Sequence, residues 1–109
     1  MEDCLFCENK EIEERTFAKN KLVFAFPTNI PIVPGHTIVC PMRHITNISE
    51  LTDQELKAIF ITIEKIKIAM RNVFKAEGFN CAWNEGKLTG QSVEHLHFHI
   101  LPRKVGDAG

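Results

Sequence analysis

The sequence predicts an α+β fold in which about five short antiparallel strands pack one face against a single long helix. Apolar residues recur at helical spacing between residues 52 and 76, and short apolar segments bounded by proline, glycine or asparagine precede and follow this stretch. Near the carboxyl end, three histidines alternate with apolar residues, which is the period of a strand. We expect the 109 residues to form one domain, residues 1–109, with one hydrophobic core.

The first 41 residues are expected to contribute three strands after an irregular start. A Cys-x-x-Cys motif at residues 4–7 is followed by a charged segment that runs to residue 14. Strands are predicted over residues 15–19, 22–26 and 36–40, with a turn at residues 20–21. Three prolines and a glycine make residues 27–35 a loop, and Pro41 stops the third strand.

The long helix is predicted over residues 52–76. Thr52 and Glu55 have the spacing of a capping box, and Gly78 is expected to stop the helix at its carboxyl end. One broad apolar stripe should face the sheet. It consists of Leu56, Ile59, Phe60, Ile63, Ile66, Met70, Val73 and Phe74.

The last two strands are predicted over residues 79–84 and 95–101, joined by a polar, glycine-containing loop. In the second of them His95, His97 and His99 would share one face while the residues between them enter the core. Neighbouring histidines would then stand roughly 6.5–7 Å apart, close enough to surround one phosphate or one metal. The competing interpretation is an edge strand whose polar face happens to be histidine.

Composition limits the classes of function. The net charge of −1 gives no basic surplus, so nucleic-acid binding through bulk electrostatics is not indicated. No apolar run approaches the ~20 residues of a membrane span, and the acidic start is unlike a signal peptide. We therefore expect a cytoplasmic protein without a membrane partner, in which four cysteines are thiols or metal ligands.

The loop before the histidines is a candidate phosphate site. Backbone N–H groups at Gly90, with the side chains of Gln91 and Ser92, could hold an anion. Near pH 7 one imidazole could act as a neutral nucleophile toward phosphorus beside a cationic neighbour. By itself the Gly-Gln-Ser segment would be an ordinary turn, and its position directly before the histidines favours a function.

A second candidate site is metal-binding. Cys4 and Cys7 supply half of a tetrahedral zinc site, and His44 with His95 would complete it. A redox-active cysteine pair is the alternative, but no βαβ pattern follows the motif.

The remaining candidates have simpler interpretations. His36 follows a tight turn at the start of a strand, where it is either functional or an ordinary surface histidine. Cys40 and Cys81 lie in apolar strands and are expected to be buried. Trp83 and the phenylalanines are expected in the core, with some phenylalanines able to line a pocket for a flat ring.

These residues resemble the histidine triad (HIT) family of nucleotide hydrolases and transferases. The resemblance covers nearly the whole chain, and residues 101–107 are similar to the dinucleoside polyphosphate hydrolase branch. The cysteine pair with His44 is similar to the zinc-bearing subset and to galactose-phosphate uridylyltransferases. The matching positions are Cys4, Cys7, Pro34, Gly35, His36, Pro41, His44, Asn84, Glu85, Gly86, Gly90, Gln91, Ser92 and residues 95–101.

The resemblance implies a five-stranded antiparallel sheet with one long helix, paired with a second copy into a ten-stranded sheet. It implies a purine nucleotide substrate, a structural zinc ion and no catalytic metal. The implied catalytic residues are His97 as nucleophile, His99 at the α-phosphate and His36. The implied substrate-binding residues are Leu5, Phe6, Phe26, Thr28, Asn29, Asn84, Gly90, Gln91 and Ser92, and the implied zinc ligands are Cys4, Cys7, His44 and His95.

One departure concerns the ribose. The family usually has Asp or Asn eight residues before the histidine of Pro-Gly-His, whereas this chain has Thr28 followed by Asn29. The leading hypothesis is an enzyme that cleaves a nucleoside 5′-monophosphate from its leaving group through a covalent nucleotidyl intermediate on His97. The alternatives are a zinc-stabilised nucleotide-binding module with little turnover, and a catalytic metal held by all three histidines.

Overall fold

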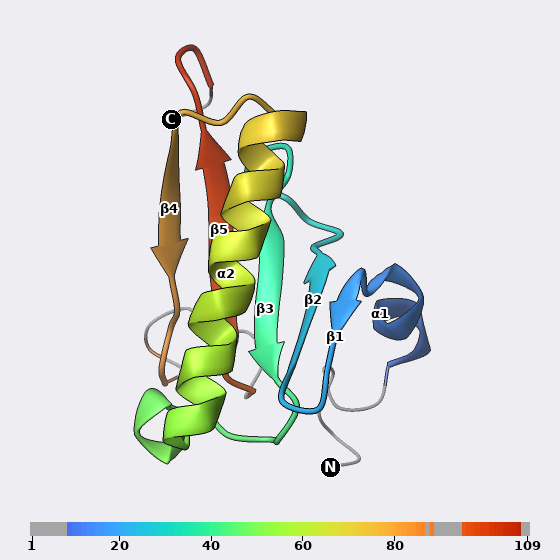
Figure 1. Cartoon of the computed structure of the whole chain (residues 1–109), viewed down its shortest axis with the longest axis vertical. Helices are drawn as coiled ribbons and strands as arrows, with labels where there is room; N and C mark the ends of the chain where they lie inside the picture. The colour runs from blue at the N-terminus through green and yellow to red at the C-terminus, as the bar shows by residue number, and fades with distance from the viewer. Residues whose placement is uncertain (1–8, 87, 89–94, 108–109) are drawn as a thin grey trace.

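The computed structural model describes residues 9–86, 88 and 95–107, and it confirms the predicted α+β architecture. A five-stranded antiparallel sheet has the order β1-β2-β3-β5-β4, and the long helix lies across one of its faces (Figure 1). The strands are β1 (Ala18–Lys19), β2 (Val23–Pro27), β3 (Thr37–Pro41), β4 (Gly78–Ala82) and β5 (Phe98–Arg103), and the helices are α1 (Lys10–Arg15), the 3₁₀ helix η1 (Ile48–Glu50) and α2 (Asp53–Val73). Within the described ranges no helix has the length and apolar character needed to cross a bilayer.

Helix α2 begins as the sequence predicts and ends earlier. The Thr52 hydroxyl accepts a hydrogen bond from the Glu55 backbone N–H at 3.1 Å, and the Glu55 carboxylate accepts one from the Thr52 N–H at 2.9 Å. This is the predicted capping box. The helix ends at Val73, and Lys75 then adopts a left-handed φ of 56°. The predicted stop at Gly78 is wrong, because the chain has already turned and Gly78 is the first residue of β4.

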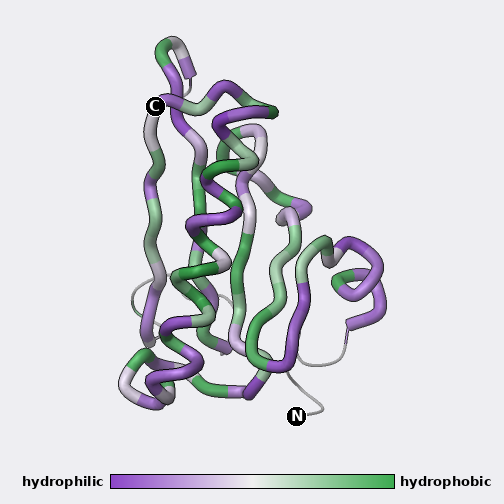
Figure 2. The backbone as a smooth tube through the Cα atoms, viewed as in Figure 1, coloured by the Kyte–Doolittle hydropathy of each residue, from purple (hydrophilic) through white to green (hydrophobic). Residues whose placement is uncertain are grey.

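The main core lies between α2 and the sheet. Four of the eight predicted stripe residues are buried, namely Ile59, Ile63, Ile66 and Met70. The other four are Leu56, Phe60, Val73 and Phe74, and between 38% and 71% of each is exposed. The predicted stripe is therefore too broad: α2 buries a narrow line of side chains, and apolar residues beside that line remain at the surface. Figure 2 shows hydrophobic and hydrophilic residues alternating along this helix.

The second face of the sheet carries a smaller core that the sequence did not predict. The charged segment before residue 15 forms α1, and its Asn9 side chain caps the helix by accepting from the Ile12 N–H at 3.1 Å. Ile12 packs there with Phe24, Phe26, Ile38 and Cys40. Because α1 includes Arg15, the predicted strand over residues 15–19 is reduced to β1.

Strand β5 begins three residues later than predicted. The ladder to β3 starts at the pair Val39↔Phe98 and the ladder to β4 at Ala82↔His99, so His95 and His97 precede the strand. Pro102 lies inside β5 rather than ending it. Of the three histidines only His99 belongs to the sheet ladder, although His97 and His99 still lie side by side with ring centres 4.9 Å apart.

Strand β4 ends at Ala82, two residues before the predicted end, and its position at the edge of the sheet exposes side chains that were expected to be buried. Cys81 is exposed and 41% of Trp83 is accessible, so both predictions are wrong, whereas Cys40 in the central strand β3 is fully buried as predicted. The Trp83 ring packs against Phe98 with ring centres 5.5 Å apart, and its indole N–H donates to Glu85 at 2.8 Å. Phe17 is also exposed.

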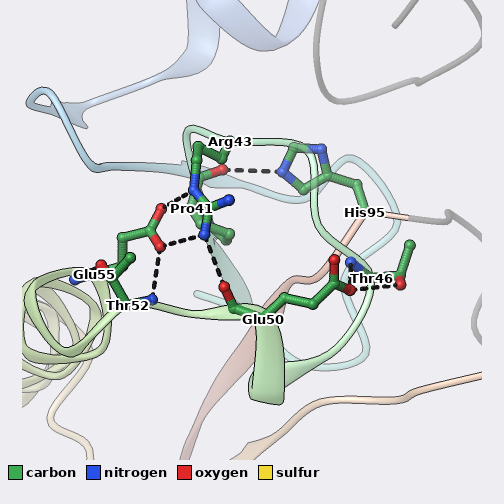
Figure 3. A network of polar contacts seen from close by, with 7 residues as sticks. All are labelled: Pro41, Arg43, Thr46, Glu50, Thr52, Glu55 and His95. Carbon is green, nitrogen blue, oxygen red and sulfur yellow. Dashed lines mark hydrogen bonds and ion pairs between the residues drawn. The ribbon is translucent and has the colours of Figure 1, made fainter.

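A buried carboxylate joins α2 to the segment that follows β3 (Figure 3). Glu55 is 2% exposed, and both its oxygens accept from the Arg43 guanidinium at 2.7 and 2.8 Å. A second Arg43 contact, to the Glu50 carbonyl at 2.8 Å, connects η1 to the same group. The Arg43 hydrogen bond holds the pKa of Glu55 at about 2, below its ordinary value of 4.5.

We expect Glu55→Gln to lower Tm at pH 7 by about 4–8 °C, because the amide loses the charged contact with Arg43. Ionised Glu55 stabilises the fold above about pH 4.5, and this stabilisation is lost as the pH falls toward 2. The difference in Tm between the wild type and the variant should therefore narrow across that range. Thermal melts at several pH values measure both effects. Glu64→Gln, which breaks an exposed pair with Lys67, is the control and should leave Tm unchanged. A wild-type Tm in the Glu55 variant at pH 7 would contradict the argument.

Candidate functional site

Antiparallel pairing of β3 with β5 brings two histidines together that are 63 residues apart. Ile38 is paired with His99, and His36 lies just before the start of β3. The Nε2 atom of His36 is 2.8 Å from the Nδ1 atom of His99, and the ring centres are 5.0 Å apart. Sheet register, rather than proximity in the sequence, therefore creates this pair.

The turn before His36 requires glycine. Gly35 has a φ of +88°, and a Cβ atom there would lie 2.9 Å from Pro102 Cγ and 3.2 Å from the Phe74 ring. The turn is thus packed between β5 and the end of α2. The His36 carbonyl accepts from the Thr28 N–H at 3.2 Å, which ties the turn to the other end of its loop.

Hydrogen bonds fix the proton positions on His36 and His99. The Ile32 backbone N–H donates to His36 Nδ1 at 3.2 Å, so this nitrogen is the acceptor and the His36 proton is on Nε2. The Nε2–H then donates to His99 Nδ1. His99 must therefore carry its own proton on Nε2 when it is neutral.

His97 is held in the opposite tautomer. Its Nδ1 atom is 2.8 Å from the carbonyl oxygen of His95. Because a carbonyl can only accept, Nδ1 carries the proton and the lone pair is on Nε2. The rings of His97 and His99 are perpendicular neighbours, with centres 4.9 Å apart. A ring in this state is a neutral nucleophile at Nε2.

The environment keeps these rings uncharged. Burial lowers the pKa of His36 and of His97 below 6.5. Burial, together with the nearby rings of His97 and His36, lowers the pKa of His99 to about 4. The expectation of a cationic histidine beside the nucleophile is therefore wrong for the protein alone, since at pH 7 all three rings are neutral.

A cleft of about 420 Å³ opens over these histidines. Three expected substrate-binding residues line it, namely Phe26, Thr28 and Asn29, beside the expected catalytic rings of His36, His97 and His99. Asn84 follows β4, half-buried, and is not among the described residues of the cleft wall. Leu5, Phe6, Gly90, Gln91 and Ser92 lie outside the described residues, so their predicted roles stay predictions.

Helix α1 adds cleft residues that sequence reasoning missed. Glu11, Ile12 and Arg15 all face the cavity that His97 and His99 line. The available signal was weak: a six-residue charged helix has one buried residue and no apolar repeat. The sequence signal for a helix there is Asn9, a residue type common at helix N-caps, three residues before the apolar Ile12.

Two of the four expected zinc ligands lie side by side. The rings of His44 and His95 are perpendicular with centres 5.1 Å apart, while Cys4 and Cys7 lie outside the described residues. Burial lowers the pKa of His95, and its Nε2–H donates to the Pro41 carbonyl at 2.9 Å (Figure 3). Among residues 9–86, 88 and 95–107, no three His, Cys, Asp or Glu side chains converge as a metal site would need. The hypothesis of a three-histidine metal centre thus has no support in this geometry.

Comparison with known proteins gives a consistent result. A model of the HIT domain matches residues 9–106. The bis(5′-adenosyl)-triphosphatase of Dictyostelium discoideum is 35% identical to this chain, and the match covers 87% of this chain's residues. The chain spans only 64% of that relative's length.

Solved structures agree with the fold. A Streptococcus mutans protein has a TM-score of 0.86 and 34% identity, covering 100% of this chain and 71% of that one. A zinc-bound histidine triad family protein from Mycobacterium smegmatis has a TM-score of 0.84 and 26% identity, covering 98% of this chain and 79% of that one.

Nitrogen-15 NMR of the histidine rings tests the proton positions. At pH 7 we expect His97 as the Nδ1–H tautomer and both His36 and His99 as the Nε2–H tautomer, because two backbone groups and one ring-to-ring bond fix them. Lowering the pH should protonate His99 only near pH 4. An imidazolium at pH 7, or a mixture of tautomers at His97, would contradict the assignment.

Proposed function

The chain belongs to the HIT domain family, and from this membership we propose that it is a nucleotide hydrolase acting through His97. It would cleave a nucleoside 5′-monophosphate from its leaving group. The observation that supports this most directly is the tautomer of His97, whose Nδ1–H is held by the His95 carbonyl. That bond leaves the Nε2 lone pair as the nucleophile.

The proposed reaction has two steps. Nε2 of His97 attacks the α-phosphorus, a nitrogen–phosphorus bond forms, and the bond from phosphorus to the leaving group breaks. Water then attacks the same phosphorus, the nitrogen–phosphorus bond breaks, and the lone pair returns to Nε2 while the water proton passes to solvent. His99 can donate its Nε2–H to a phosphate oxygen during both steps.

The named relative and the size of the cleft support a proposal for the substrate class. The Dictyostelium protein is a bis(5′-adenosyl)-triphosphatase, so we propose dinucleoside polyphosphates as substrates, with nucleoside phosphoramidates as the alternative. A cleft of about 420 Å³ is within the usual range for a small-molecule site and would enclose one nucleotide half. The other half, the leaving group, would then extend beyond the cleft.

Replacing the nucleophile tests the function. We expect His97→Ala to reduce hydrolysis of diadenosine triphosphate at least about a thousandfold, because the variant lacks the proposed nucleophile. Glu64→Gln, an exposed change on α2, is the control and should keep the wild-type rate. Alkaline quenching with labelled substrate should trap AMP on the wild-type chain and not on the His97 variant.

Two results would contradict the proposal. A His97→Ala variant that keeps the wild-type rate would remove the nucleophile. A wild-type protein that binds AMP but hydrolyses none of the substrates would instead support a nucleotide-binding module.

We also propose a structural zinc ion held by Cys4, Cys7, His44 and His95. The adjacency of His44 and His95 supports it, as does the hydrogen bond from His95 Nε2–H to a backbone carbonyl. Histidine ligands of zinc commonly donate their other ring N–H to such a carbonyl, which here would direct Nδ1 to the metal. The zinc-bound Mycobacterium smegmatis structure is consistent with a metal in this family.

Elemental analysis tests the zinc proposal. We expect about one zinc per chain, and Cys4→Ser should lose the metal and lower Tm, because a structural site contributes directly to folding. Cys81→Ser should retain both. A zinc-free preparation with unchanged Tm and activity would contradict a structural role.

A homodimer is proposed through the open edge of the sheet. Strand β4 is an edge strand with exposed side chains, and 41% of Trp83 is accessible beside it. On α2, Leu56 and Phe60 are also exposed. Pairing β4 with its copy would satisfy the edge and extend the sheet to ten strands.

A further inference from the structure

The wall of the cleft formed by α1 carries two charged side chains that the proposed reaction does not use. Arg15 and Glu11 line the same cavity as His97 and His99, one turn apart on α1. Phe26 and Ile12, both almost fully buried, line the same cavity. Apolar side chains of this kind suit an aromatic base, and the charged groups beside them suit its polar edge.

Arg15 has one donor without a partner in the described part of the chain. Its Nε atom is buried and has no hydrogen-bond partner among the described residues. The guanidinium carbon lies 5.9 Å from the centre of the Phe26 ring, and the distance from Nη1 to Glu11 Oε1 is 3.4 Å. Nε is enclosed and does not reach the cleft, but the contact from Nη1 to Glu11 is long and the Glu11 side chain is 69% exposed, so the outer guanidinium nitrogens and the carboxylate can bond to a ligand.

Two other polar side chains of the cleft, Asn9 and Thr28, already have partners. The Asn9 side-chain oxygen accepts from the Ile12 N–H, and the Thr28 hydroxyl accepts from the Ile30 N–H at 3.3 Å. Arginine can only donate hydrogen bonds, and an ionised glutamate can only accept them. The cleft wall therefore presents one donor group beside one acceptor group.

We propose that this pair selects guanine nucleotides over adenine nucleotides, an inference that rests on the proposed nucleotide hydrolase function. The polar edge of guanine has the acceptor O6 beside the donors N1–H and N2–H₂. Arg15 would donate to O6 while Glu11 accepts from the two donors. Adenine has a donor amino group in place of O6, which would face the guanidinium without an acceptor.

Comparison of two substrates tests the selectivity. For diguanosine triphosphate we expect kcat/KM at least tenfold higher than for diadenosine triphosphate. Arg15→Met keeps the apolar part of the side chain and removes the donors, so the preference should disappear through a higher KM for the guanosine substrate with kcat unchanged. Glu11→Gln should reduce the preference in part. Glu14→Gln, an exposed change on the same helix outside the cleft wall, should leave it unchanged.

Binding of the monophosphates separates this inference from the hydrolase proposal. GMP should bind at least tenfold more tightly than AMP by calorimetry, and Arg15→Met should equalise the two. If neither substrate is hydrolysed but GMP is still preferred, the hydrolase proposal fails and the selectivity stands. If both substrates are hydrolysed equally well, or Arg15→Met leaves the preference unchanged, the selectivity is overturned and the hydrolase proposal stands.

Discussion

The pairing of β3 with β5 is the contact on which the site depends. Three Cα pairs join these strands, and they bring together rings that are 63 residues apart in the chain. Closing such a long loop costs conformational entropy, which the core between α2 and the sheet must offset. A shift of this register by one residue would turn His99 to the opposite face and separate it from His36.

Backbone groups determine which nitrogen of each histidine ring carries the proton. The Ile32 N–H and the His95 carbonyl fix the protons on His36 and His97, and the Pro41 carbonyl does the same for His95. Burial lowers the pKa of these rings and keeps them neutral, whereas the carbonyl bonds to His95 and His97 act in the opposite direction on the pKa and set the tautomer. The network of Arg43 and Glu55 holds the segment after β3, next to the strand end that supplies the Pro41 carbonyl (Figure 3).

Local patterns predicted much of the fold. Strands β2 and β3 and the capped start of α2 each follow from a few adjacent residues, and the structure has them nearly where expected. Features set by neighbouring strands could not be predicted from local patterns. The start of β5 at Phe98 depends on where its ladder to β3 begins. The exposure of Cys81 depends on the position of β4 at the edge of the sheet. Helix α1 was missed because a single buried residue, Ile12, gives no period to detect.

The same limits apply to the site. The histidines could be identified in the sequence because they form a recognisable motif, and Thr28 and Asn29 because they lie where the family usually has Asp or Asn before His36. Arg15 could not be identified, since only the docking of α1 against the second face of the sheet brings it to the cleft. The sequence thus predicted the histidines of the cleft better than the residues that α1 contributes to it.

Gly35 has a consequence for engineering that reaches beyond its own turn. Because Pro102 and Phe74 enclose the place where its side chain would be, the strand, the helix end and the His36 loop must be transplanted as one unit. A designer who grafted only the histidines onto another sheet would lose the spacing between them. Gly35 therefore determines which segments have to be transferred together with the histidines.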